Sequence, residues 1–144
     1  MDLMLQRRVT AAGTMNAYPL GLAAIQATIS IYEKGNGAIY KQVDKVQRRL
    51  MDGMKETAKR HNFPMYIQGP TGVFVALFTD KQEINNATDL LTQDFKRQGK
   101  FINTMLADEG ILTTVGGRYY VSAALTEKDV DKTLEIMDSV MGKI

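Results

Sequence analysis

The organisation of this chain is set by the stretch GTMNAYPLGLAA, residues 13 to 24. A glycine, a hydroxyl side chain and a polar turn residue precede Pro19, which opens a nearly all-apolar segment. Proline is favoured at the first position of a helix, because the N–H that it lacks has no helical partner there. Two interpretations of the loop are open. Either Thr14 or Asn16 caps the helix, or the Thr14 hydroxyl and nearby backbone N–H groups hold a phosphate.

Composition and charge exclude several classes of protein. With a net charge of +2 over 144 residues, the chain lacks the basic surplus of a nucleic-acid-binding protein. No apolar run approaches the ~18 residues of a membrane span, and Arg7-Arg8 follow the N-terminal apolar residues, unlike in a signal peptide. There is no cysteine, and His61 is the only histidine, so a thiolate or two-histidine metal site is impossible. We therefore expect a cytoplasmic protein without a metal site.

Hydrophobic periodicity predicts two helices in the first part of the chain. Residues 19–33 are apolar on nearly every side, so we expect this helix to be buried on more than one side. The cluster Gly35-Asn36-Gly37 ends it. From Ala38 to His61, apolar residues recur at intervals of three and four, which indicates one buried stripe and a charged, solvated face.

Short strands and helices follow one another in the rest of the chain. The turn Gly69-Pro70-Thr71-Gly72 lies between two β-rich runs and predicts a hairpin; as a phosphate loop it lacks the Lys-Ser/Thr ending and a following helix. The predicted elements are strands 65–68 and 73–78, helices 86–97 and 99–108, strands 111–115 and 118–124 around Gly116-Gly117, and a last helix opened by the capping box Thr126-Glu127-Lys128-Asp129.

This order of elements predicts an α+β fold. We expect a small antiparallel sheet with helices packed on one face, preceded by the long apolar helix. The break at Gly35-Asn36-Gly37 separates the apolar helix from the α+β part that follows it.

Carboxylate pairs and the single histidine are the first candidates for acid–base chemistry. Asp129 and Asp131, and likewise Asp108 and Glu109, stand at predicted helix ends, where carboxylates are common as caps and partners of the helix dipole. His61 stands at a predicted helix C-terminus, where a cation is favourable in any case. We therefore expect structural roles for these side chains and assign no catalytic residue.

Arg118 is the stronger candidate for a binding residue. It stands between Gly116-Gly117 and Tyr119-Tyr120, at the start of a predicted strand. A guanidinium fork is suited to a carboxylate, and two adjacent rings could shape a pocket. The alternative is a surface arginine on an edge hairpin. The residues themselves thus offer one phosphate contact and one carboxylate contact, with no nucleophile, base or metal beside them.

Taken together, these segments resemble the C-terminal part of class III, fold type I, pyridoxal-phosphate-dependent aminotransferases, a group that includes the glutamate-1-semialdehyde aminomutases. The resemblance covers almost the whole chain, and it rests on the order and spacing of several motifs. These are the stretch Gly13 to Ala24, the long helix Lys41 to Arg60, the segments Gly72-Val73-Phe74 and Leu77-Phe78-Thr79-Asp80, and the closing stretch Ser122 to Asp131.

The resemblance implies that residues 1–37 are an interface loop and buried helix on the large-domain side, and that residues 38–144 are the small C-terminal α+β domain. It also implies roles for particular residues. Gly13 and Thr14 match the loop that contacts the phosphate of pyridoxal 5'-phosphate (PLP) in the neighbouring subunit of a dimer. Arg118 falls where several members place the arginine that holds the carboxylate of a small amino or keto acid. Two departures stand out: Tyr18 replaces the asparagine before the proline, and Leu125 stands where aminomutase-like members commonly have histidine. They favour a general aminotransferase over an aminomutase.

The resemblance also implies a missing half of the active site. The lysine that binds PLP covalently, the aspartate that pairs its ring nitrogen and the aromatic ring that stacks on it all precede the threonine loop in this family. We therefore expect that residues 1–144 cannot perform amino-group transfer alone, and that the partner is a second copy or a chain carrying the N-terminal half. Without that half, we expect the helix at residues 19–31 to expose an apolar face and the isolated chain to associate or to be poorly soluble. The alternative is a stand-alone, non-catalytic binding or regulatory module that buries residues 19–31 in its own core or in a homodimer.

Overall fold

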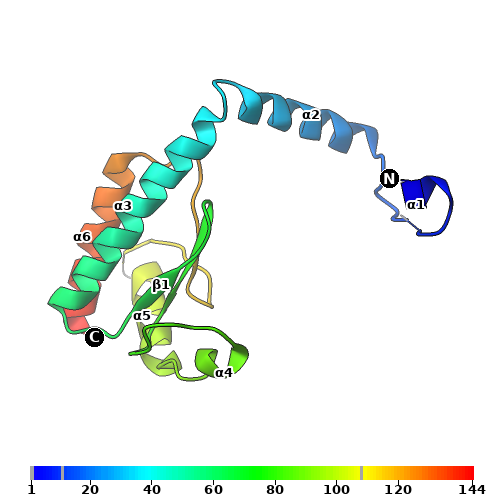
Figure 1. Cartoon of the computed structure of the whole chain (residues 1–144). Helices are drawn as coiled ribbons and strands as arrows, with labels where there is room; N and C mark the ends of the chain where they lie inside the picture. Colours follow the sequence, from blue (N-terminus) through cyan, green and yellow to red (C-terminus); the bar gives the residue numbers. More distant parts are fainter. Residues whose placement is uncertain (1, 11, 108) are drawn as a thin grey trace. The chain divides into compact units, whose positions relative to one another are not determined.

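The computed structural model describes residues 2–10, 12–107 and 109–144. The chain divides into two compact units, Met1–Ala38 and Ile39–Ile144, called unit 1 and unit 2 below. The elements in chain order are α1 (Asp2–Leu5), α2 (Pro19–Glu33), α3 (Ala38–Arg60), β1 (Tyr66–Gln68), β2 (Val73–Leu77), α4 (Ala87–Leu90), α5 (Phe95–Ala107), β3 (Arg118–Tyr120) and α6 (Glu127–Lys143) (Figure 1).

Helix α2 begins at Pro19, as its sequence predicts, but without the predicted cap. The N-cap residue is Tyr18, and no side chain makes a capping hydrogen bond there. Asn16 instead belongs to a turn in which its backbone N–H donates to the carbonyl of Gly13 at 2.9 Å. The prediction that Thr14 or Asn16 caps this helix is therefore wrong. The turn before Pro19 is shaped by its own backbone, and Ala17 takes the left-handed conformation at φ 59°.

The apolar side chains of α2 remain on the surface. No residue of this helix is buried, and Leu20 is 69% exposed. Burial of residues 19–33 on more than one side is therefore not seen in this chain by itself, and the helix has the exposed apolar face expected when its partner is missing. Its C-terminal break is as predicted, because Gly35, Asn36 and Gly37 all adopt positive φ angles that end an α-helix.

Unit 2 has a continuous apolar core between its helices and its sheet. The stripe predicted for α3 is buried, and α6 contributes the stripe that begins at Val130. The largest fully buried side chains are Phe74, Phe78, Phe101, Met54, Met105 and Met137. Helices α3 and α6 lie side by side (Figure 1), and exposed ion pairs between them include Lys45 with Glu127. The α+β class predicted from the sequence is confirmed.

The sheet has three antiparallel strands in the order β1-β2-β3 among the described residues. Tyr66 of β1 pairs with Leu77, and Val75 of β2 pairs with Arg118. The hairpin predicted around residues 69–72 is confirmed. The predicted strand 111–115 is wrong: β3 pairs with β2, and Ile111 closes the end of α5 by donating its N–H to the carbonyl of Met105 at 2.8 Å.

The helical segment after β2 is interrupted earlier than predicted. Asn86 caps the short helix α4 by accepting a hydrogen bond from the Asp89 N–H. Asp94 then starts α5, because its side chain accepts from the Arg97 N–H at 2.9 Å. Helix α5 continues through Gly99, where a break was predicted. Two competing caps, rather than the glycine, therefore decide where the helices begin.

Candidate functional site

The loop before α2 offers free polar groups on the surface. The Thr14 hydroxyl makes no hydrogen bond to any residue that the structure describes, and Thr14 itself is exposed. Gly13 leaves room for the neighbouring side chain, since a Cβ there would lie 2.8 Å from Asn16 Oδ1. With no side-chain cap at Tyr18, the first N–H groups of α2 also lack a side-chain acceptor. A hydroxyl and backbone donors at such a position can bind a phosphate.

Arg118 opens β3 and has its backbone held by one threonine. The Arg118 N–H donates to Thr114 Oγ1 at 3.1 Å, and the same hydroxyl donates to the Arg118 carbonyl at 2.9 Å. The guanidinium is exposed and forms no ion pair or hydrogen bond within the described part of the chain. The backbone of Arg118 is therefore held in place, and its guanidinium remains available to bind a carboxylate.

Gly117 brings this segment close to β2. Its φ is +69°, and a Cβ there would lie 2.6 Å from both the Ala76 carbonyl oxygen and Gln98 Nε2. The Ala76 N–H donates to the Gly117 carbonyl at 2.9 Å, while Gln98 Nε2 donates to the Ala76 carbonyl at 3.1 Å. Gln98 is buried. Sequence reasoning missed Gln98, because the amide gains its role only from the packing of α5 beside Ala76 of β2.

The structure separates the two tyrosines that follow Arg118. Tyr119 stacks on Phe74 with ring centroids 4.8 Å apart, and burial raises the pKa of its phenol. Tyr120 is 64% exposed. Because neighbouring strand residues point to opposite faces, Tyr120 shares a face with Arg118 and Tyr119 does not.

A hollow of about 440 Å³ lies beside β3. Arg118 and both tyrosines line it from β3, and Leu50 and Leu125 line it from α3 and from the segment before α6. Arg118 is the only charged residue among the described residues that line it. Thr113, from the loop before β3, also lines it, and its hydroxyl is buried without a hydrogen-bond partner in the described structure.

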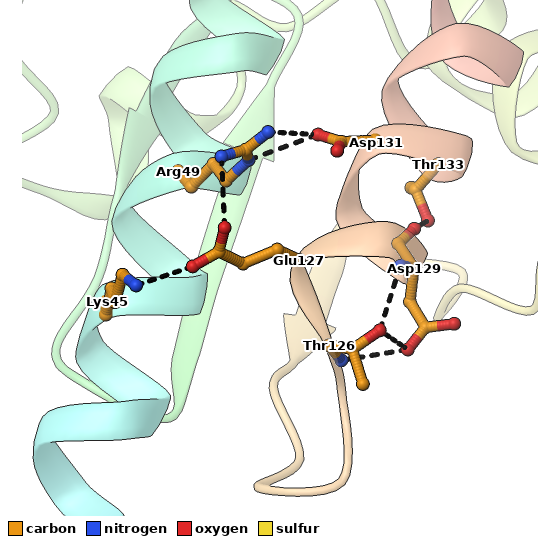
Figure 2. Close-up of polar contacts among 7 residues, drawn as sticks. All are labelled: Lys45, Arg49, Thr126, Glu127, Asp129, Asp131 and Thr133. Atoms are coloured by element: carbon orange, nitrogen blue, oxygen red, sulfur yellow. Dashed lines mark hydrogen bonds and ion pairs between the residues drawn. The ribbon is translucent and has the colours of Figure 1, made fainter.

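The carboxylates considered for acid–base chemistry have structural partners. Figure 2 shows the predicted capping box, in which Asp129 Oδ2 accepts from the Thr126 N–H at 2.8 Å. This contact and the Thr126 hydroxyl, which donates the leading hydrogen bond, lower the pKa of Asp129. Asp131 pairs with Arg49 of α3. The capping box is confirmed.

The remaining acid–base candidates have structural partners as well. His61 Nε2 lies 2.9 Å from Asp138 Oδ1, and this hydrogen bond is the main cause of the lowered pKa of Asp138. Glu109 pairs with Lys143 at 3.5 Å, while Asp108 lies outside the described residues. The described residues include no group of three or more acidic or histidine side chains placed to hold a metal, and none of their helices has the length and hydropathy to cross a membrane.

Comparison with solved structures identifies the class of fold. The omega-transaminase from Sphaerobacter thermophilus superposes with a TM-score of 0.76 at 15% identity, over 94% of this chain and 30% of that one. The beta-phenylalanine aminotransferase from Variovorax paradoxus gives 0.72 at 20% identity, with the same coverage. The chain thus has the fold of an aminotransferase C-terminal domain.

Sequence comparison adds the family. The chain is 30% identical over 139 residues to the glutamate-1-semialdehyde 2,1-aminomutase of Fusobacterium nucleatum, covering 95% of this chain and 32% of that protein. Identity to the enzyme of the same name from Desulfitobacterium hafniense is 32% over 135 residues, or 92% and 30% of the two chains. No family model matches. The chain spans about a third of the length of these relatives and corresponds to the C-terminal portion of a class III PLP-dependent enzyme.

Proposed function

We propose that this chain provides the C-terminal part of a PLP-dependent class III aminotransferase, which moves an amino group between an amino acid or amine and a keto compound. The observation that carries the proposal is that Arg118, whose guanidinium has no partner within the described part of the chain, lines a hollow with no other charged residue among those described. A guanidinium in such surroundings suits a substrate carboxylate. The relatives' names, aminomutase and aminotransferase, support the reaction class.

Gly13 and Thr14 fit the phosphate end of the cofactor. PLP, when bound, supplies the electron sink for amino-group transfer. The Thr14 hydroxyl would donate to its phosphate, and backbone N–H groups near Gly13 and at the start of α2 would add further donors. The absence of a side-chain cap on α2 supports this role, since the capping alternative for Thr14 does not hold.

The lysines of the chain support a covalent anchor located elsewhere. A lysine that forms a Schiff base is commonly activated by desolvation or by a neighbouring cation. Every lysine here is exposed, and Lys45, Lys81 and Lys143 each pair with a carboxylate. We propose that the complementary half of the site comes from another part of a longer protein or from a partner chain.

The exposed apolar side chains of α2 support association with such a partner, either a second copy or the N-terminal half of the enzyme. Ile25 and Ile29 are 55% and 49% exposed, and isolated exposed patches of this kind commonly mark interfaces. A stand-alone module would bury residues 19–31 in its own core, and no residue of α2 is buried. The homodimeric form of that module remains the alternative candidate.

Complementation tests the proposal. The chain is co-expressed with the part of the Fusobacterium nucleatum enzyme that precedes the matched region, and amino-group transfer is assayed with and without the chain. We expect activity only in the co-expressed pair, with Thr14→Val weakening PLP retention and Thr14→Ser preserving it. Arg118→Gln should raise KM for the carboxylate substrate. A stoichiometric covalent adduct of PLP with the chain alone, trapped by borohydride and found by mass spectrometry, would contradict the proposal.

A further inference from the structure

We propose that Asn36 is a site of spontaneous covalent modification, at which a side-chain amide becomes a carboxylate. The reacting groups are the Asn36 amide and the backbone nitrogen of Gly37, in the turn between α2 and α3. Water is the co-reactant, and no second protein is needed. The inference goes beyond the proposed function, because it uses neither the loop before α2 nor the hollow beside β3.

The reaction closes a ring and then opens it with water. The Gly37 nitrogen gives its proton to solvent and attacks the side-chain carbonyl carbon of Asn36. A C–N bond forms, the bond from this carbon to Nδ2 breaks, and ammonia leaves after taking up a proton, so a five-membered succinimide remains. Water then adds to one of the two ring carbonyls. Opening at the side-chain carbonyl gives aspartate, and opening at the main-chain carbonyl gives isoaspartate.

The turn leaves both reacting groups accessible. Asn36 is the only asparagine of the sequence that precedes a glycine. Its side chain is exposed and makes no hydrogen bond to any residue that the structure describes. The Gly37 N–H likewise makes no hydrogen bond within the described ranges. Because Gly37 has no Cβ, nothing crowds its nitrogen, and the turn is free to take the conformation that ring closure needs.

Asn62 provides a contrast within the same chain. It has nearly the same backbone conformation, with a φ of 52° against 53° at Asn36. The residue after it is Phe63, whose side chain is buried and whose N–H donates to the Ala58 carbonyl at 2.8 Å. The Phe63 nitrogen is therefore crowded and hydrogen-bonded, whereas the Gly37 nitrogen is neither. The left-handed conformation alone does not make a reactive site, and the free N–H and the missing Cβ distinguish Asn36.

The modification changes both the charge and the backbone of the turn. The new carboxylate stands just before α3, which has no acidic residue in its first turn. Negative charge near a helix N-terminus is favourable. Isoaspartate also carries the main chain through its side chain, which lengthens the backbone by one atom. The turn then loses the conformation in which Gly35, Asn36 and Gly37 all have positive φ.

The test follows the full chain over time at neutral and mildly alkaline pH. Samples are digested at acidic pH, which stops the reaction, and the peptides are identified by mass spectrometry. We expect the peptide with Asn36 to gain about 1 Da, since an OH replaces an NH2, and to do so faster at higher pH. Part of the product should accept a methyl group from an isoaspartate O-methyltransferase. The peptide with Asn62 should keep its mass in the same digest.

Two variants identify the attacking nitrogen. Gly37→Ala should slow the gain in mass about tenfold or more, because a Cβ crowds the nitrogen and restricts the backbone. Asn36→Gln should remove the gain over the same period, because the longer side chain has to close a six-membered ring, which forms more slowly. Gly99→Ala, a glycine-to-alanine change in α5, is the matched control and should leave the rate at Asn36 unchanged.

Four outcomes would overturn the proposal. The first is an unchanged mass at Asn36 under conditions in which a synthetic peptide of residues 30–42 gains about 1 Da. The second and third are a gain without isoaspartate and a gain that Gly37→Ala leaves equally fast, since direct hydrolysis of the amide by water yields only aspartate and does not use the Gly37 nitrogen. The fourth is an equal gain at Asn62, which would mean that the fold does not select the site.

Discussion

Helices α2 and α3 follow one another in the chain but differ in where their apolar side chains find partners. In α3 the buried residues include Val46, Leu50 and Met54, all part of the core of unit 2. In α2 no residue is buried, although most of its side chains are apolar. The difference shows that apolar content predicts a helix but not what covers it. The apolar stripe of the amphipathic helix is buried by other residues of unit 2, whereas the uniformly apolar helix leaves its side chains exposed.

The largest expected effect is the difference in stability lost on truncating a core residue of unit 2 and an exposed residue of α2. Phe74→Ala should destabilise the chain by about 3–5 kcal/mol, because Phe74 is fully buried and its ring stacks on Tyr119. The matched substitution Ile25→Ala in α2 should cost less than about 1 kcal/mol. Urea unfolding followed by circular dichroism measures both. Equal losses would mean that α2 is packed as tightly as the core.

The next effect concerns association through α2. Replacing Ile25 and Ile29 together by Lys should weaken self-association about a hundredfold, since each buried isoleucine contributes about 1.5–3 kcal/mol. Lys41→Glu in α3, on an exposed side chain, serves as the control and should leave association unchanged. Light scattering over a concentration series gives the mass. A monodisperse monomer for the unaltered chain would remove the contrast between the two helices.

Within unit 2, replacing Gly117 and Gly99 by alanine should have opposite effects on stability. Gly117→Ala should destabilise the chain by about 1–3 kcal/mol, because alanine is strained at φ +69° and its Cβ would meet the Ala76 carbonyl. Gly99→Ala in α5 faces open space and should stabilise by about 0.5–1 kcal/mol. Thermal unfolding of the two variants should therefore move in opposite directions. A loss in both would indicate that Gly99 has a packing role.

Replacing a threonine at a helix end should lower stability more than replacing one on a helix surface. Thr126→Ala removes the capping box of α6 and should cost about 1 kcal/mol. Thr28 is a mid-helix threonine of α2 whose hydroxyl donates to the Ala24 carbonyl at 2.8 Å. Its replacement by Ala should be neutral or slightly stabilising, because alanine is the better helix former. Urea midpoints of the two variants test the contrast, which fails if Thr28→Ala is the more harmful.

The smallest effect is a dependence of stability on pH at the same cap. The pKa of Asp129 lies below its ordinary value of 3.8, mainly through the Thr126 hydroxyl. Since the folded-state pKa is lowered, the stabilisation is present above the unfolded pKa and is lost as pH falls through the folded pKa. Asp129→Asn should therefore flatten the decline in urea midpoint below pH ~4. An unchanged acid limb would mean that Asp129 makes no net contribution.

Local sequence signals predicted much of the fold. Pro19, the break at Gly35-Asn36-Gly37 and the capping box at Thr126 lie where expected, because each acts through contacts a few residues apart. The predictions that failed depend on a competing helix cap or on strand pairing between distant segments. Asp94 starts α5 where a longer helix was expected, and the segment 111–115 forms no strand because β2 takes β3 as its neighbour.

The candidate site was predictable in part. Arg118 stands out in the sequence through its neighbours, and the structure leaves its guanidinium available. Its role and those of Gly13 and Thr14 stay predictions. The sequence does not distinguish Thr113 from the other threonines. Only the fold shows that its hydroxyl is buried without a hydrogen-bond partner in the described structure.

Residues that are close together in the sequence were enough to predict the class of fold, the positions of the main helices and the residues that resemble a cofactor and substrate site. The reason is that turns, caps and apolar stripes depend on residues only a few positions apart in the sequence. The packing of distant segments, in contrast, places Tyr119 against Phe74, leaves Tyr120 exposed, and brings Thr113 and Arg118 to the lining of one hollow. Those outcomes depend on which distant segments pack together, because burial and pairing are properties of neighbours in space.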